Sequence, residues 1–311
     1  MSAPPGATVP YVAYQEGLCA VGERKPAVSV VEVASGRGVA PTTFAARFPG
    51  RWVSLPPRAP EVVAAAVARS EDGASVFVEA PVPFLLADAF PAVVRSLVHP
   101  RRNAKLVGLP TAGPLGRATW DDLGAMRGLP AMTVVAPADG PTTRTATVAL
   151  AERDGPAYVR LPSEGAAPVT DGTFSVGRAH ELRAGSDLTV IALGAMVARA
   201  AEVAGELARV GVSVRLLDAA SVKPFDEAAV LRSARDTGAI LVAEDAALAT
   251  GVGTVVAAMT AENYPVPVRR LGLPDVAAPG EDAAALDRAG LSVERLRDEA
   301  WELLRLRGKA T

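Results

Sequence analysis

Apolar positions along the chain fall into short runs of strand length that alternate with longer amphipathic segments. Runs of about four to eight residues rich in Val, Ile and Leu are typical of buried strands, whereas apolar residues every three or four positions are typical of helices. In the first half of the chain we predict strands at residues 27–33, 52–55, 75–79, 104–109, 132–136 and 157–161. The intervening helices are predicted at residues 12–23, 41–47, 61–69, 84–98, 121–127 and 142–153.

A looser stretch rich in Ser, Glu, Gly and Pro separates this series from a second one. In the second series we predict strands at 188–193, 213–218, 239–243 and 266–271, and helices at 197–210, 226–235, 251–262 and 293–304. Largely apolar strands that alternate with helices indicate mostly parallel sheets covered on both faces. We therefore predict an α/β protein with two open, mostly parallel-sheet domains, at residues 8–165 and 187–311, joined by a linker at 166–186.

Composition excludes several classes of protein. The 311 residues carry a net charge of −2 without a basic or acidic block, which argues against nucleic-acid binding. A single cysteine, Cys19, excludes an internal disulfide, and two histidines are too few for a site that needs three. The chain has no long apolar run and no signal-like N-terminus, so we expect a cytoplasmic protein without a membrane segment.

Glu61 is the first candidate for chemistry because it begins the helix that follows a proline-rich turn. A carboxylate near the positive end of a helix dipole stays ionised in a polar setting. In a dry pocket between subunits the same group would have a raised pKa and would handle protons. The alternative is an ordinary acidic residue in the first turn of a helix, which is a common arrangement.

Three further positions have both a functional and a structural interpretation. Arg160 ends a strand, where it suits a phosphate or carboxylate ligand, but an ion pair with an acid such as Glu164 is equally consistent. Phe84 offers a flat wall for a planar ring, or a core side chain. The run Gly251-Val-Gly253 opens a helix that suits a phosphate, but it lacks dinucleotide-motif spacing, and tight packing explains the glycines more simply.

The chain resembles the C-terminal half of transketolase, as found in split, two-subunit transketolases, over nearly its whole length. The segments that carry the resemblance lie at residues 44–52, 96–100, 122–139, 154–161, 221–226, 238–245 and 250–253. The resemblance implies a thiamine diphosphate pyrimidine-binding domain followed by a transketolase C-terminal-like domain. It also implies transfer of a two-carbon ketol, or related acyl, unit between small-molecule substrates.

The resemblance further implies a partner. In this family the diphosphate of thiamine diphosphate and its Mg²⁺ are bound by an N-terminal domain through a Gly-Asp-Gly motif, which this chain lacks. We therefore expect an N-terminal transketolase-like subunit to bind both, and we expect the two chains to associate into a heterotetramer.

Several family site residues differ in this chain. An ungapped comparison puts Ala59 where the family has the glutamate that bonds the pyrimidine ring, and Glu61 is the displaced candidate for that role. Phe84 matches the stacking phenylalanine, and Pro81 replaces an aromatic residue. Arg117 stands where the family has a sugar-contacting histidine, and Arg160 is retained as a substrate-binding candidate.

These departures leave two hypotheses open. In the first, the chain is a subunit of an active two-chain enzyme with an altered site. In the second, it is a catalytically inactive structural or regulatory partner that retains the fold and the subunit interface.

Overall fold

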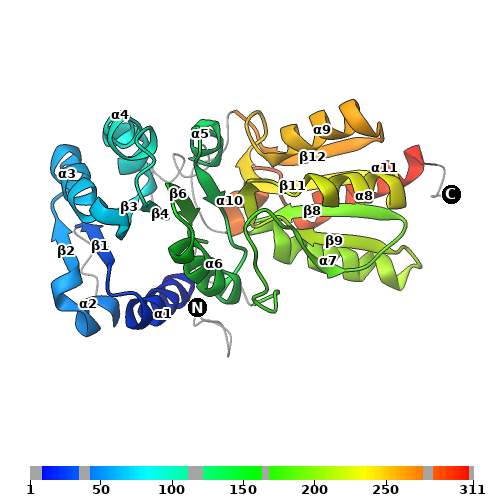
Figure 1. Cartoon of the computed structure of the whole chain (residues 1–311). Coiled ribbons are helices and arrows are strands. Elements are labelled where there is room, and N and C mark those ends of the chain that lie inside the picture. The colour runs from blue at the N-terminus through cyan, green and yellow to red at the C-terminus, as the bar shows by residue number, and fades with distance from the viewer. Residues whose placement is uncertain (1–8, 35–42, 111–121, 163–167, 276–282, 308–311) are drawn as a thin grey trace.

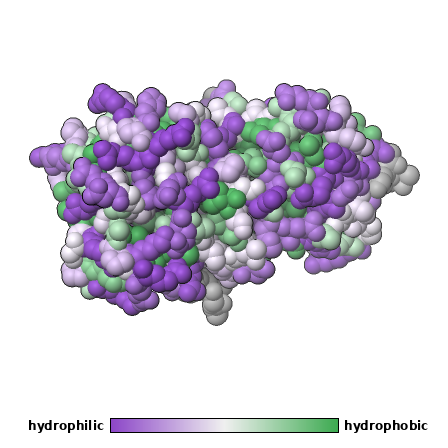
Figure 2. Space-filling view, viewed as in Figure 1, coloured by the Kyte–Doolittle hydropathy of each residue, from purple (hydrophilic) through white to green (hydrophobic). Residues whose placement is uncertain are grey.

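The computed structural model describes residues 9–34, 43–110, 122–162, 168–275 and 283–307, which form two adjoining α/β units (Figure 1). The α/β class with two mostly parallel sheets is confirmed. None of the described helices is long and apolar enough to cross a membrane. Hydrophilic residues cover most of the face seen in Figure 2, and apolar residues appear there in scattered groups.

The first sheet has seven strands in the order β10-β5-β6-β4-β3-β1-β2. Its strands from the first half of the chain are parallel, namely β1 (Val28–Val33), β2 (Trp52–Leu55), β3 (Ser75–Pro81), β4 (Ala104–Leu109), β5 (Thr133–Val135) and β6 (Ala157–Arg160). The seventh strand, β10 (Ser221–Lys223), comes from the second half and pairs antiparallel with β5. The two halves of the chain therefore share backbone hydrogen bonds as well as side-chain contacts.

Helices cover both faces of the first sheet because its strands are apolar on both sides. One face packs on α1 (Pro10–Arg24) and α6 (Gly140–Glu152), and its core contains Tyr14, Val30 and Phe77. The other face packs on α3 (Ala59–Arg69), α4 (Phe90–Val93) and α5 (Asp122–Gly128). The short α2 (Thr43–Arg47) lies against α1.

The second sheet has five strands in the order β12-β11-β8-β9-β7. Its parallel strands are β8 (Leu188–Leu193), β9 (Val214–Asp218), β11 (Ile240–Ala247) and β12 (Val268–Leu273). The edge strand β7 (His180–Arg183) is antiparallel and lies within residues predicted as a linker, so the second sheet begins before residue 187. The helices are α7 (Met196–Arg209), α8 (Glu227–Thr237), α9 (Val252–Asn263), α10 (Ala283–Arg288) and α11 (Val293–Leu306).

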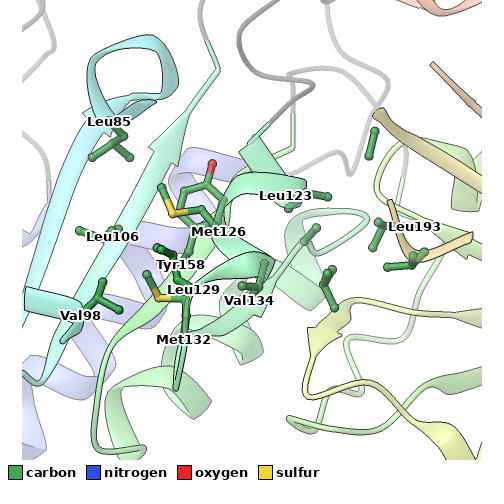
Figure 3. Close-up of a cluster of buried hydrophobic side chains, with 14 of the residues drawn as sticks. Leu85, Val98, Leu106, Leu123, Met126, Leu129, Met132, Val134, Tyr158 and Leu193 are labelled. Carbon is green, nitrogen blue, oxygen red and sulfur yellow. The ribbon is translucent and has the colours of Figure 1, made fainter. Parts of the chain in front are cut away.

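A continuous apolar core joins the two units. Leu106 and Val134 of the first sheet belong to the same buried cluster as Leu193 of the second (Figure 3). The side chains of α5, Leu123 and Met126, lie between them. The two units are therefore packed together through apolar contacts at their junction.

The helix predicted at residues 84–98 is interrupted. Two π-helical turns, Phe84–Asp88 and Val94–Val98, flank α4. Pro91 lies in the first turn of α4, and a proline has no backbone N–H for the regular helical ladder. The backbone N–H groups of Ala89 and His99 instead donate to carbonyls five residues earlier, which is the hydrogen-bond pattern of a π-helix.

Candidate functional site

The carboxyl ends of the parallel strands in the first sheet collect the candidate residues. The turn after β2 leads into α3, where Ala59 and Glu61 lie, and the end of β3 carries Pro81 and leads into the turn that begins at Phe84. Ala59 packs against the same apolar cluster that contains Phe84. Ligands of open α/β sheets bind outside this edge. These four positions therefore lie near the carboxyl ends of β2 and β3 in the sequence.

Glu61 lies in the first turn of α3 with its carboxylate accessible to solvent. The Arg58 guanidinium donates to that carboxylate at 3.0 Å, and the two side chains are 69% and 46% exposed. Exposed pairs of this kind contribute about 0–1 kcal/mol, so little free energy opposes a different partner for Glu61. Ala59 is the first residue of the helix and offers only a methyl group.

Phe84 is largely a core side chain. Only 5% of it is exposed, and it packs with the buried residues of the face that carries α3 and α4. Pro81, the last residue of β3, is half-buried and lies three residues before Phe84 in the sequence. The chain therefore supplies most of the contacts to the Phe84 ring itself, which favours the core interpretation of this residue.

Arg160 is engaged by two carboxylates at the junction of the units. Its guanidinium donates to the Asp245 carboxylate at 2.5 Å and to the Asp245 carbonyl at 3.0 Å, and it lies 3.4 Å from the Asp122 carboxylate. Burial opposes the charge of Arg160, but Asp245 and Asp122 together raise its pKa. These contacts support the ion-pair interpretation of Arg160, with Asp122 and Asp245 as the partners. Glu164, the partner suggested by the sequence, lies outside the described residues.

The partners of Arg160 are themselves held in place. Asp122 accepts hydrogen bonds from the Tyr158 hydroxyl and, at 2.6 Å, from the backbone N–H of Leu123. The second Asp245 oxygen accepts from the N–H of Ala195 at 3.0 Å, just before α7 begins. One buried network therefore connects β6, α5, β11 and the start of α7 across the junction.

The N-terminus of α9 is filled by a carboxylate from the chain itself. Glu244 is fully buried and accepts from the N–H groups of Val252 and Gly253 at 2.6 and 3.0 Å. A Cβ atom on Gly251 would lie 2.1 Å from the Glu244 carboxylate. The glycines thus allow Glu244 to approach the helix, which supports the packing interpretation over phosphate binding.

Replacing Glu244 with alanine is expected to lower the free energy of unfolding by about 1–3 kcal/mol, because two buried N–H groups lose their acceptor. Urea unfolding of the full chain measures the loss. Glu262→Ala, at an exposed position of the same helix, is the matched control and should change little. Equal losses in the two variants would contradict the capping role.

Arg117 and His180, the remaining polar candidates, are not seen near this site in the part of the chain that the structure describes. Arg117 lies within residues 111–121, outside the described part of the chain. His180 lies 3.3 Å from the Asp171 carboxylate at the edge of the second sheet. No group of three or more His, Cys, Asp or Glu residues that suits a metal ion occurs in the part of the chain that the structure describes.

Sequence reasoning overlooked four acids as individual positions, namely the buried Asp122, Glu244 and Glu79 and the partly buried Asp245. Glu79 had a visible signal, since it interrupts the apolar run of β3 with a charge, yet the structure buries it completely. Charged residues are almost never fully buried without partners. An acid inside a strand that should be buried on both faces is therefore a sign of a specific polar network.

Known proteins resemble this chain over most of its length. The family described as "Transketolase, C-terminal domain" matches residues 177–296. The 6-deoxy-6-sulfo-D-fructose transketolase subunit SqwH of Clostridium sp. (strain MSTE9) is 36% identical over 239 residues, covering 75% of this chain and 74% of that protein. A subunit of apulose-4-phosphate transketolase from Phocaeicola vulgatus is 32% identical over 240 residues, covering 75% of this chain and 77% of that protein.

A solved structure agrees with these relatives. A split-gene transketolase described as an inactive β4 tetramer superposes with a TM-score of 0.91 at 32% identity, covering 96% of this chain and 99% of that one. The similarity therefore extends over both units and is not confined to one of them. This chain belongs to the transketolase family and is homologous to subunits of split transketolases.

Proposed function

We propose that this chain is the pyrimidine-side subunit of a two-chain, thiamine diphosphate-dependent transferase that moves a two-carbon ketol, or related acyl, unit between small molecules. The observation that carries the proposal is the mutual coverage of about three quarters with two proteins that are each named as a transketolase subunit. The solved split-gene transketolase matches 96% of this chain, so the similarity is not that of one reused domain.

The partner in this proposal is an N-terminal subunit that binds the diphosphate and Mg²⁺. The sequence has no Gly-Asp-Gly diphosphate motif, and the described residues contain no acidic or histidine cluster that suits a metal. Self-association accompanies this pairing and gives a heterotetramer. The name of the solved relative, a β4 tetramer, supports a self-association surface in chains of this kind.

The described residues fit the pyrimidine end of the cofactor in two respects. The half-buried Ala59 and Pro81 would give apolar contacts at the carboxyl edge of the first sheet, the Phe84 ring would add only its small exposed part, and Glu61 gives an accessible carboxylate in the first turn of α3. When bound, thiamine diphosphate supplies the electron sink for the transferred unit. Glu61 would leave Arg58 and would accept and return a proton at the pyrimidine ring when the cofactor is bound.

The two arginines receive different roles. Arg117 remains our proposed contact to the substrate. Arg160 is proposed to hold the two units together at their junction, because its guanidinium is already bound by Asp122 and Asp245. A substrate phosphate or carboxylate would have to displace one of these acids from a buried network, which is costly.

A catalytically inactive partner is the second candidate function. The observation that favours it is the methyl group of Ala59 at the position where the resemblance implies a carboxylate. The chain would then retain the fold and the subunit surface and contribute stability or regulation to the assembly.

Calorimetric titration tests the proposal. We expect thiamine diphosphate to bind the co-expressed complex of this chain and its N-terminal partner in a Mg²⁺-dependent manner, and to bind this chain alone far more weakly. Phe84→Leu keeps an apolar side chain in the core and should weaken the titration without preventing assembly. A complex that assembles but takes up no thiamine diphosphate would contradict the enzyme proposal and favour the inactive partner.

A further inference from the structure

Glu79 lies at the point where the strand order of the first sheet reverses. The chain runs from β1 outward to β2 and then returns to β3 on the other side of β1. Glu79 of β3 is directly opposite Glu32 of β1 in the parallel register. Neighbouring strands are about 4.8 Å apart, so these two acids, on the same face of the sheet, are close neighbours.

Helix α1 closes over this pair of acids. The Tyr11 hydroxyl donates to one Glu79 oxygen at 3.0 Å, and the Gln15 amide donates to the other at 3.0 Å. The Gln15 carbonyl oxygen accepts from the backbone N–H of Phe44 at 3.4 Å. We call Tyr11, Gln15 and Glu79 the α1 clasp, because they join the first helix to the sheet.

The clasp lies in a buried and acidic setting. Glu79 and Tyr14 are fully buried, and the Tyr14 hydroxyl has no hydrogen-bond partner among the described residues. Burial, followed by the charge of Glu79, raises the pKa of Tyr14. Among the described residues, the titratable groups that face Glu79 are Tyr11 and Tyr14 from α1 and Glu32 from β1, with no basic side chain.

These surroundings disfavour a charge on Glu79. Burial is the largest cause and raises the pKa of Glu79 to about 8; the hydroxyls of Tyr14 and Tyr11 and the Gln15 amide lower this pKa, and the charge of Glu32 raises it. This setting therefore favours the neutral form of the Glu79 carboxyl. An ionised Glu79 would be a buried anion beside a second acid, and α1 must move to admit water to it.

We propose that the α1 clasp is a pH-dependent device that holds α1 on the first sheet while Glu79 is neutral and loosens it when Glu79 ionises beside Glu32. This inference does not rest on the proposed function. The stabilisation is fully present below the ordinary pKa of a free Glu. It falls as the pH rises and reaches its lowest level above the pKa of the folded state, about 8.

Amide hydrogen exchange in residues Pro10–Arg24, followed by mass spectrometry on the full chain, tests the proposal. Glu79→Gln keeps the shape of the neutral acid but cannot ionise. At each pH the wild-type rate is divided by the variant rate, so the intrinsic pH dependence of exchange cancels. We expect this ratio to rise by roughly tenfold per pH unit between about pH 5 and pH 8 and then to level off.

Two further variants complete the experiment. Glu16→Gln makes the same chemical change at an exposed position of α1 and should follow the wild type. Glu32→Gln removes the neighbouring charge, so the pKa of Glu79 falls. The rate of Glu32→Gln divided by that of Glu79→Gln should therefore level off at a lower pH than the wild-type ratio does. A flat ratio for Glu79→Gln overturns the proposal. If Glu79→Gln does not fold, the exchange rates of Glu32→Gln are compared directly with those of the wild type at each pH. Identical pH dependence of exchange in these two proteins then overturns the proposal.

Discussion

Replacing Glu61 with alanine is expected to slow hydrogen–deuterium exchange at the reactive carbon of bound thiamine diphosphate by roughly 10²–10⁴-fold, the usual effect of losing a placed general acid–base group. The complex with the N-terminal partner is used, and NMR follows the exchange without any need to know the substrate. Glu61 is suited to this role because its carboxylate is accessible and its ion pair is with the exposed Arg58.

A second variant tests whether the carboxylate can act from position 59 instead of position 61. In Ala59→Glu combined with Glu61→Ala, the acid moves to the first residue of α3, and we expect exchange to recover. Glu71→Ala, an exposed acid just beyond the other end of α3, is the control and should leave exchange unchanged. Wild-type exchange in Glu61→Ala would contradict the assignment of Glu61.

Replacing Arg160 with methionine is expected to lower the free energy of unfolding by about 3–5 kcal/mol, because it leaves the buried Asp122 and the partly buried Asp245 without their cation. Methionine retains much of the apolar stem, so the loss reports the charge rather than a cavity. Urea unfolding of the full chain provides the measurement.

The matched control is Arg58→Met, which removes an arginine from an exposed ion pair and should change stability by about 0.5 kcal/mol or less. Adding Asp245→Asn to Arg160→Met should recover part of the loss, because the double variant leaves one unpaired charge fewer at the junction. Equal losses in Arg160→Met and Arg58→Met would show that the junction network does not stabilise the fold.

The alternation of apolar strands with helices was enough to predict the α/β class, because it depends only on periodicity within each element. Elements without a period of their own were missed. Strand β10 is three residues long and precedes Pro224, and it becomes a strand only because β5 lies beside it. Pro91 was overlooked in the predicted helix at 84–98, where the structure has two π-helical turns.

In the candidate site, too, features set by neighbouring residues could be predicted from the sequence, whereas contacts between residues far apart in the chain could not. The position of Glu61 in the first turn of α3 follows from a local signal, whereas the strand predicted at 75–79 stops short of Pro81, where β3 ends. The partners of Arg160 do not follow from local signals, because Asp122 and Asp245 lie 38 and 85 residues away in the sequence. Glu79 is similar, since its donors Tyr11 and Gln15 come from a helix that is distant in sequence and reaches the strand only in the fold.

The wild-type exchange rate in the two-chain complex decides between an enzyme and an inactive partner. Thiamine diphosphate and Mg²⁺ are added to the co-expressed complex, and exchange at the reactive carbon is compared with that of free cofactor under the same conditions. We expect the complex to accelerate exchange by roughly 10²-fold or more. Cofactor that binds but exchanges no faster than in solution would contradict the enzyme proposal and would identify this chain as an inactive partner.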